Sequence, residues 1–389
     1  MMFRVLAGCL LLVCLIIIGC VPTIKPVQFP AEPNIRIALM TAEERVAITA
    51  TTQFTIYSGN ERKVVKPGAI CRISYYNTIT VQGVIWLKAA SFPVQIKAES
   101  NGFVSVGSRT YRGYIEVRKD QSGKLTVINI LPIEKYLFGV VPCEIGGLNE
   151  KNLEAGKAQA IAARSYALSH LNWFNHLGFD LFASYQRDQE YRGQGAETEM
   201  TNKAVLATSG IVAVYHNKVI EAKYHSTCGG YTMSGQAPYL RALPDTPKHR
   251  KSTKPFCSQS PHFVWRKSLN QAGFITALSK IIPNLNPKAR LRSIRLEKDR
   301  RTQRNRLVNI VTNRGRHKIK SDALRGALEL KTNFYSVKLT RRTITITGHG
   351  YGHGLGLCQY GTREMANKGY SSEEILKHYY SGIKLKKIY

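Results

Sequence analysis

The segment NEKNLEAGKAQAIAARSYALSHLNW, residues 149–173, decides the fold class of this chain. It contains no proline and is rich in Ala, Leu, Glu and Lys, which are strong helix formers. Asn149 is a suitable N-cap, and Ile161, Arg164 and Leu168 fall on one helical face. Because the many alanines allow another element to pack closely, we expect a central and largely buried helix.

The residues on either side of this helix follow different patterns. From residue 34 to about residue 130, short apolar runs rich in Val, Ile, Thr and Tyr are separated by Gly, Asn and Asp, which predicts β-strands. Beyond the central helix, strands are expected between residues 211 and 227. Further helices are expected over residues 197–209, 362–368 and 372–380. The predicted fold class is therefore α+β, with a β-rich region over residues 34–110 and a mixed α/β region over residues 111–389.

The N-terminus carries an export signal. An unbroken apolar run over residues 5–18 follows Arg4; it is short for a bilayer span and typical of a signal-peptide core. It ends in Ile-Ile-Gly-Cys, which resembles a bacterial lipobox and predicts lipidation of Cys20 after removal of residues 1–19. A plain membrane anchor is the alternative. Residues 21–33 hold four prolines and predict a tether.

The formal net charge of +31 is extreme for a folded chain of 389 residues. Such a charge ordinarily suggests nucleic acid. Export to the cell envelope argues against that partner and favours anionic wall polymers or membrane surfaces. Thirteen Lys and Arg against two acidic residues fall within residues 288–320. This segment is either a solvated face or a contact surface for an anionic polymer.

The stretch GHGYGHGLGLCQYG, residues 348–361, admits three interpretations. His349 and His353 suggest a metal pair, but alternating glycines disfavour a helix, and in an extended chain these side chains lie about 13 Å apart. A glycine-rich phosphate loop is disfavoured because an exported protein meets no nucleotide. The third interpretation is a strand or loop with one bare backbone face, which another backbone or a sugar can approach closely. No cofactor is expected.

A second dense segment, IEKYLFGVVPCEIGG, spans residues 133–147. It is interpreted as a strand-like apolar run that ends at Pro142, with Glu144 just behind it. Apolar neighbours would desolvate the Glu144 carboxyl, and desolvation raises a carboxyl pKa and creates a proton donor. A surface glutamate in a turn is the plain alternative.

Several motifs occur in one order along the chain. They are YRGYIEV at 111–117, the segment 133–168, DQEYRG at 188–193, YHSTCGG at 224–230, CSQSPHFVW at 257–265, LKTNFYSV at 330–337 and the stretch 348–361. Together they resemble the stage II sporulation protein D (SpoIID) family, which also includes amidase-enhancer proteins. The resemblance covers residues 112–389 and, more weakly, the β-rich residues before them.

The resemblance implies a SpoIID-like catalytic region with a substrate cleft and the activity of a peptidoglycan lytic transglycosylase. Such enzymes cleave between N-acetylmuramic acid and N-acetylglucosamine, leave a 1,6-anhydro sugar, and act on glycan stripped of stem peptides. Glu144 occupies the family's catalytic position. Arg164 is expected to hold the muramoyl carboxylate or Glu144. The polar residues expected to bind sugar are Tyr191, Tyr224, His225, His349, His353 and Gln359.

Five cysteines lie beyond the export segment, too few and too widely spaced for a disulfide framework. Cys228 and Cys257 both lie in turn-like sequence and could form one bridge. Some family members bind a structural zinc ion, and Cys228, Cys257, His262 and His225 could supply ligands for one here. Cys143 and Cys358 depart from the family, which commonly has alanine and serine at these positions.

Three functions stay open at this stage. The first is a membrane-tethered lytic transglycosylase with Glu144 as its acid and base. The second is a non-catalytic glycan-binding enhancer of an N-acetylmuramoyl-L-alanine amidase, for which the basic segment would serve as the binding face. The third, an exported nucleic-acid binder, rests on charge alone.

Overall fold

The computed structural model of the protein describes residues 28–247 and 254–389. The predicted signal peptide and the lipidation site Cys20 lie outside these residues, as does most of the predicted tether. The last residues of the tether contact the folded body: the Phe29 amide donates to the Ile388 carbonyl at 2.8 Å. No helix within residues 28–247 and 254–389 is long and apolar enough to span a membrane.

The N-terminal part of the described chain consists of two sheets. The seven-stranded sheet has the order β13-β1-β12-β11-β8-β3-β4, and the six-stranded sheet has the order β10-β9-β2-β5-β6-β7. Apolar side chains of both sheets belong to one core, because alternate positions along each strand point inward. The strands of the first sheet are β1 (Asn34–Glu43), β3 (Phe54–Ser58), β4 (Glu61–Val65), β8 (Val94–Ala98), β11 (Tyr114–Lys119), β12 (Leu125–Pro132) and β13 (Leu181–Phe182). Those of the second are β2 (Arg45–Ala50), β5 (Cys71–Ser74), β6 (Ile79–Val81), β7 (Val84–Leu87), β9 (Val104–Val106) and β10 (Arg109–Tyr111).

A central region of helices follows directly from strand β12. Helix α1 (Ile133–Ile145) packs on α2 (Leu153–Ser169) and α3 (Glu199–Leu206). A three-stranded sheet of β14 (Ile211–Tyr215), β15 (Lys218–Val219) and β24 (Lys384–Lys387) adjoins them, as do α6 (Gln359–Asn367) and α7 (Ser372–Tyr379). Helix α2 is buried along most of its length because its alanines admit close neighbours on several sides. Its core is continuous with that of the two sheets, so the boundary predicted at residue 110 lies inside one core.

Residues 264–349 form a distal lobe with a separate hydrophobic core. It contains two three-stranded sheets and two short helices. The strands are β17 (Val264–Asn270), β21 (Tyr335–Leu339) and β22 (Thr343–His349) in one sheet and β18 (Leu291–Lys298), β19 (Asn305–Thr312) and β20 (Gly315–Lys320) in the other. The helices are α4 (Gln271–Ser279) and α5 (Ser321–Ala327). The predicted basic segment, residues 288–320, contains the whole of β18, β19 and β20.

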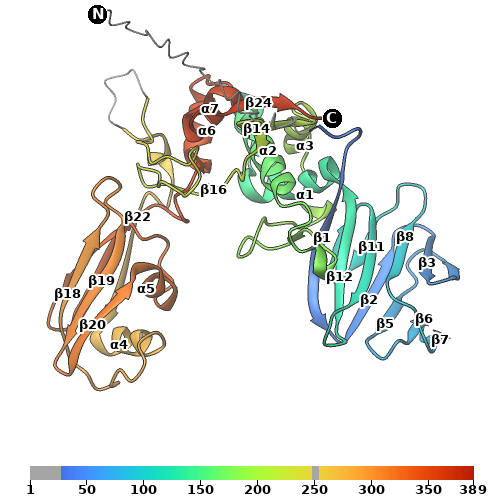
Figure 1. The fold of residues 1–389 in the computed structure, drawn as a ribbon, viewed down its shortest axis with the longest axis horizontal. Helices are drawn as coiled ribbons and strands as arrows, with labels where there is room; N and C mark the ends of the chain where they lie inside the picture. Colours follow the sequence, from blue (N-terminus) through green and yellow to red (C-terminus); the bar gives the residue numbers. More distant parts are fainter. Residues whose placement is uncertain (1–27, 248–253) are drawn as a thin grey trace, which may run out of the picture.

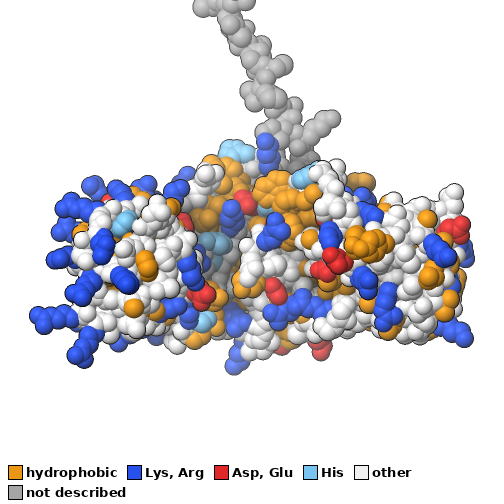
Figure 2. Space-filling model, turned by 90° about the horizontal axis from the view of Figure 1, so that it is seen from below, with side chains coloured by type: hydrophobic (Ala, Val, Ile, Leu, Met, Phe, Trp, Pro, Cys, Tyr) orange, Lys and Arg blue, Asp and Glu red, His pale blue; other side chains and the backbone are white. Residues whose placement is uncertain are grey.

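The three parts lie in a row, with the β-rich sheets at one end, the central helices in the middle and the distal lobe at the other end (Figure 1). Lys and Arg side chains crowd the distal lobe, whereas the face is hollowed between this lobe and the central region (Figure 2). Of the thirteen basic residues in 288–320, Arg304 is buried and the others are exposed. The lobe is therefore strongly cationic at its surface.

The α+β fold class predicted from sequence is confirmed, and so are helices close to each predicted range. One prediction is wrong: residues 133–145 form helix α1 and not a strand-like run. Val, Ile, Phe and Tyr in this segment favour strands intrinsically, but the helix is buried on nearly all sides, so tertiary packing decides its structure.

Candidate active site

Helix α1 places Glu144 in its last turn, at the edge of the central region. Pro142 lies inside the helix and lacks an amide proton, so the helix weakens just before its end. It terminates at Gly146, and Gly147 follows with a φ of 70°. The chain then reverses into α2, whose approach is fixed by a capping box on Asn149. Glu144 thus projects from a helix end that is held in place by the turn at Gly146 and Gly147 and by the capping box on Asn149.

The Glu144 carboxylate accepts hydrogen bonds from two distant segments. The Glu190 backbone amide donates to Oε1 at 3.2 Å, and the Gln359 side-chain amide donates to Oε2 at 3.0 Å. The Tyr224 hydroxyl also hydrogen-bonds this carboxyl. Glu144 is therefore oriented by groups that come from three other parts of the chain.

Burial raises the pKa of the Glu144 carboxyl above its ordinary value, while the donors from Glu190, Gln359 and Tyr224 act in the opposite direction. The net direction is upward because desolvation is the largest effect. Such a carboxyl holds its proton to higher pH than an exposed glutamate does, while its hydrogen-bond donors still stabilise the carboxylate once the proton has left. Proton donors and acceptors in catalysis need this balance.

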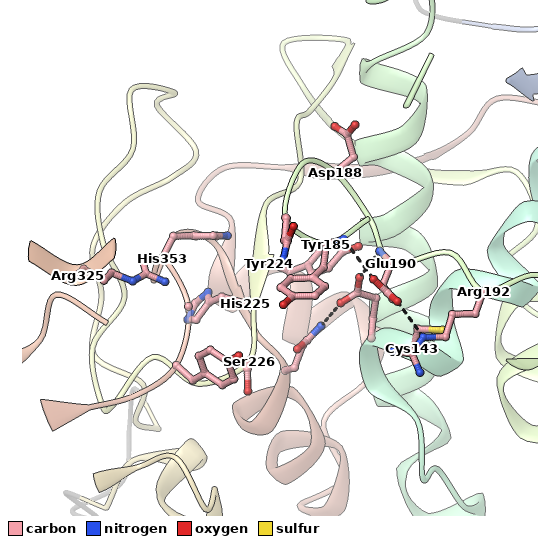
Figure 3. A pocket seen from close by; sticks show the side chains of 15 residues that line it. Cys143, Tyr185, Asp188, Glu190, Arg192, Tyr224, His225, Ser226, Arg325 and His353 are labelled. Atoms are coloured by element: carbon pink, nitrogen blue, oxygen red, sulfur yellow. Dashed lines mark hydrogen bonds and ion pairs between the residues drawn. The ribbon is translucent and has the colours of Figure 1, made fainter. Parts of the chain in front are cut away.

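Glu144 lines a cavity of about 550 Å³ between the central region and the distal lobe. Figure 3 shows His225, His353 and Arg325 on one side and Cys143, Glu190 and Arg192 on the other, with Tyr224 and Tyr185 between them. The remaining lining residues are Gln186, Asp188, Ser226, Tyr351, Gly352 and Gln359. Aromatic rings, amides, two arginines and three carboxylates line this wall, which suits a polar ligand with several hydroxyl groups.

The glycine-rich stretch builds one wall of this cavity as a loop, not as a regular strand. Strand β22 ends at His349, and the following even-numbered glycines have positive φ values. Gly350 (φ 79°) lies so close to another backbone that a Cβ there would approach the Thr227 carbonyl to 2.5 Å. A Cβ at Gly352 (φ 109°) would likewise lie 2.8 Å from the His225 Cβ. The bare glycine face therefore packs against the YHSTCGG segment. The two segments also pair as parallel strands, β16 (Tyr224–His225) with β23 (Leu357–Cys358).

His225 and His353 face each other at the cavity, with ring centroids 5.5 Å apart. Burial lowers the pKa of the His225 imidazole to about 3, so this ring is neutral at neutral pH. The pKa of the His353 imidazole is lowered as well, by desolvation and by its neighbours His225 and Lys223. His225 Nδ1 is 3.1 Å from the Leu355 carbonyl, and its Nε2 has no hydrogen-bond partner among the described residues. Two uncharged imidazoles in a polar cavity are suited to hydrogen-bond a neutral hydroxyl group.

Arg164 does not reach the cavity, which corrects its predicted role. Its side chain is fully buried and forms a two-pronged ion pair with Glu134, at 2.8 Å and 2.6 Å. It also donates to the Ile211 carbonyl at 2.9 Å. Arg164 therefore ties helix α2 to α1 and β14 and is not among the residues that line the cavity.

Two further predicted sugar-binding residues lie elsewhere. Tyr191 is 1% exposed, and its hydroxyl donates to Asn129 at 2.8 Å in the core. His349 packs against the rings of Phe263 and Phe334 outside the cavity. The even spacing of the stretch 348–361 suggested that His349 and His353 share a face, but the left-handed glycines between them send the two side chains apart. Tyr224, His225, His353 and Gln359 all line the cavity.

The cysteine prediction is partly changed by the structure. Cys228 and Cys257 lie together, with Sγ atoms 3.4 Å apart, and Cys358 and Asp245 join them. His262 is not part of this group: its Nδ1 lies 2.9 Å from Lys331 Nζ, and its ring contacts Tyr351. His225 is also outside the group.

Sequence reasoning missed two cations of the cavity, Arg192 and Arg325. Arg192 directly follows a residue that had been singled out, but its ion pair with Glu190 at 2.8 Å has no sequence signature. Arg325 lies in α5 of the distal lobe, about 180 residues from Glu144 along the chain. Its segment shows no motif, so only the packing of the lobe on the central region reveals it.

The fold and cavity define an α+β protein with one desolvated carboxyl in a polar, aromatic cleft. The family model described as "Stage II sporulation protein" (SpoIID) matches residues 121–215, which include Glu144 and the Asp188–Gly193 motif. The chain is similar to "Stage II sporulation protein D" of Bacillus amyloliquefaciens, at 31% identity over 270 residues, covering 65% of this chain and 74% of that protein. The chain belongs to the SpoIID family.

Two other relatives of this chain carry different names. The protein of the same name from Bacillus subtilis (strain 168) is 29% identical over 312 residues, covering 76% of this chain and 86% of that protein. "Amidase enhancer" of the same organism is 27% identical over 293 residues, covering 64% of this chain but 40% of that protein. The family therefore includes proteins with two different kinds of name.

Proposed function

We propose that the protein is a lytic transglycosylase that cleaves peptidoglycan glycan strands with Glu144 as its single acid and base. The observation that carries this proposal is the Glu144 carboxyl itself. It lies at a cavity of about 550 Å³, its pKa is raised by burial, and three donors hold it in place. This is the arrangement that a reversible proton carrier requires.

The proposed reaction needs no water. Protonated Glu144 donates its proton to the glycosidic oxygen, and the bond between that oxygen and C1 of N-acetylmuramic acid breaks. The resulting carboxylate accepts the proton of the C6 hydroxyl of the same sugar, and O6 bonds to C1. The products are an N-acetylglucosamine end and a 1,6-anhydro sugar, and Glu144 is protonated again for the next cycle.

The other carboxylates at the cavity support a one-carboxyl mechanism. Glu190 is engaged by Arg192 at 2.8 Å and by the Tyr185 amide at 3.3 Å. Asp188 accepts from the Tyr166 hydroxyl at 3.1 Å and from the Phe182 amide at 2.8 Å. A glycoside hydrolase ordinarily needs a second carboxylate that is available to act on water or on the sugar. Here both candidates are committed to structural contacts.

The proposed substrate is glycan whose stem peptides have been removed. Removal of the peptide leaves a free lactyl carboxylate on each muramic acid, and Arg325 offers a cation at the cavity wall to bind it. His225, His353 and Tyr224 would then bind hydroxyl and acetamido groups. Arg325 replaces Arg164 in this role.

An isotope experiment separates the proposed reaction from hydrolysis. Purified peptidoglycan is first stripped by an amidase and then digested in water enriched in oxygen-18, and the products are analysed by mass spectrometry. Anhydro ends without the heavy label are expected, because O6 of the sugar closes the ring. Reducing ends that carry one heavy oxygen would instead identify a hydrolase.

A non-catalytic amidase enhancer is the second candidate. The similarity to the relative named "Amidase enhancer" favours it, as does the exposed basic surface of the distal lobe. As an enhancer, the Glu144→Gln variant would stimulate an added amidase as well as the wild type does. Charge reversals at Arg292, Arg295, Arg300 and Arg301 would weaken stimulation. Reversals at four exposed residues of the β-rich region, Arg62, Lys66, Arg72 and Lys88, serve as the charge-matched control.

We also propose that the protein is exported and held to a cell-envelope membrane by a lipid on Cys20. The apolar run over residues 5–18 and the Gly-Cys pair that follows it support this. Mass spectrometry of the N-terminal peptide tests the proposal: a diacylglyceryl group on Cys20 is expected, and an intact N-terminus that begins at Met1 would contradict it.

A further inference from the structure

Four buried side chains converge behind the cavity wall. They are Cys228, Cys257, Cys358 and Asp245, each 0% exposed, and one potential ligand atom from each lies within 4.8 Å of all the others. They come from separate parts of the chain. Cys228 follows β16, and Asp245 lies in a loop. Cys257 belongs to the 3-10 helix Phe256–Gln259, and Cys358 is the N-cap residue of α6. Tetrahedral zinc with thiolate ligands has ligand atoms about 3.8 Å apart, so the cluster has the size of such a site.

A disulfide does not account for this cluster. Cys228 and Cys257 Sγ are 3.4 Å apart and thus unbridged, and a bridge would leave Cys358 and Asp245 without a role. Asp245 accepts from the Tyr379 hydroxyl at 2.7 Å and from the Cys257 amide at 2.9 Å. No Lys, Arg or His of the described residues forms an ion pair with it, although a buried carboxylate needs a cation.

We propose that Cys228, Cys257, Cys358 and Asp245 together bind one zinc ion in a buried, closed structural site. Three thiolates and one carboxylate carry four negative charges, so one Zn²⁺ leaves a net charge of −2. The three thiol protons pass to solvent when the ion binds. Thiolate-rich tetrahedral geometry selects zinc over the harder cations Mg²⁺ and Ca²⁺.

The surroundings are suited to offset the remaining charge. Arg304, 2% exposed, donates to the Cys228 carbonyl at 2.7 Å and has no carboxylate partner among the described residues. The Cys228 amide donates to Cys358 Sγ at 3.2 Å, and Cys358 occupies the N-cap position of the nine-residue helix α6, whose N-terminus favours negative charge. Hydrogen bonds from neighbouring residues to the metal ligands orient these ligands and strengthen metal binding.

The position of the site gives the ion a structural purpose. Cys358 directly precedes Gln359, which donates to Glu144, and Cys228 lies three residues after His225 of the cavity wall. Arg304 belongs to the distal lobe, while the four ligands lie outside it. The ion therefore fixes the segments that carry the cavity wall at the point where the lobe joins the central region.

Metal content of the full-length chain tests this site directly. The protein is purified in detergent without reductant, and its zinc is measured by inductively coupled plasma mass spectrometry together with its intact mass. About one zinc ion per chain is expected. Cys358→Ser and Asp245→Asn should each retain at least ~10-fold less zinc after dialysis. Cys71→Ser removes a buried cysteine outside the cluster and should retain the ion.

Cobalt substitution of the unmutated chain keeps the test decisive if the ligand variants fail to fold. The spectrum of a tetrahedral Co²⁺ site with thiolate charge-transfer bands is expected after zinc is exchanged for cobalt. The proposal is overturned if the wild type contains no zinc and has lost two hydrogens to a Cys228–Cys257 disulfide. It is also overturned if bound cobalt shows no thiolate bands, or if Cys71→Ser loses zinc as readily as Cys358→Ser.

Discussion

At the scale of single residues, Glu144 is governed by two opposing influences. Desolvation favours its protonated form, and hydrogen bonds from Glu190, Gln359 and Tyr224 favour its ionised form. Because the same group must first give and then accept a proton in the proposed cycle, neither influence can be dispensed with. Gln359 is the most separable of the donors, since its side chain acts on Glu144 through one hydrogen bond at 3.0 Å.

Gln359→Leu should move the pH dependence of cleavage to higher pH. The lost donor stabilised the carboxylate, so the pKa of Glu144 rises further above its ordinary value and the acid form persists to more alkaline pH. The descending limb of kcat/KM against pH on stripped glycan reports this change. Gln186→Leu, which alters another glutamine of the same cavity, should leave the limb in place. An unchanged limb in Gln359→Leu, or a limb at lower pH, would contradict the assignment.

At the scale of elements, local signals predict some features well and others not at all. Helix α2 was predictable because its alanines and the Asn149 cap act within one segment. Helix α1 was misread because its β-branched and aromatic residues are overruled by burial on nearly all sides. Glu144 was found through its family motif, but its partners Glu190 and Gln359 are 46 and 215 residues away, and no local pattern reports such contacts.

The glycine-rich loop shows the same limit. Its composition indicated a close backbone approach, and the structure supplies the neighbour, the segment around Thr227. The left-handed backbone at Gly350 and Gly352 determines which histidine side chain points toward the cavity. The alternation of glycine with other residues in the sequence does not predict this backbone conformation. His353 was therefore predictable as a cavity residue only together with His349, which lies elsewhere.

Gly350→Ala should destabilise the protein more than Gly369→Ala does. Both glycines have a φ near 80°, but a Cβ at Gly350 meets the Thr227 carbonyl at 2.5 Å, whereas nothing lies within 4 Å of one at Gly369. The backbone conformation alone costs about 1–3 kcal/mol in each variant, and the clash adds to it only at Gly350. Urea unfolding monitored by circular dichroism measures the difference. Equal losses of unfolding free energy would show that the close approach is unimportant.

At the scale of the whole molecule, the cavity is lined by two parts of the chain that have separate hydrophobic cores. The central region supplies Glu144, Tyr224 and Gln359, whereas the distal lobe supplies Arg325 from helix α5. The lobe also carries a dense basic surface, to which an anionic polymer would be attracted over a distance set by salt. In the proposed function, the lobe would therefore capture the substrate and the central region would carry out the chemistry.

Arg325→Gln should weaken binding of stripped glycan with little effect on the chemical step. The lost charge-assisted contact to a lactyl carboxylate is worth about 1.5–3 kcal/mol, which corresponds to a KM about 10–100-fold higher. Arg316→Gln removes an exposed charge from the same lobe and should change KM little. Steady-state kinetics on soluble glycan fragments compare the two. A fall in kcat at constant KM would instead assign Arg325 to the reaction itself.

The catalytic assignment of Glu144 is tested most directly by its amide variant. Stripped peptidoglycan is digested with the wild type, with Glu144→Gln and with Glu150→Gln, an exposed glutamate nearby in sequence, and anhydro ends are counted by mass spectrometry. Glu144→Gln keeps the shape of the side chain but cannot carry the proton, so its rate should fall at least ~100-fold, while Glu150→Gln matches the wild type. Equal release of anhydro ends by all three proteins would contradict the central claim.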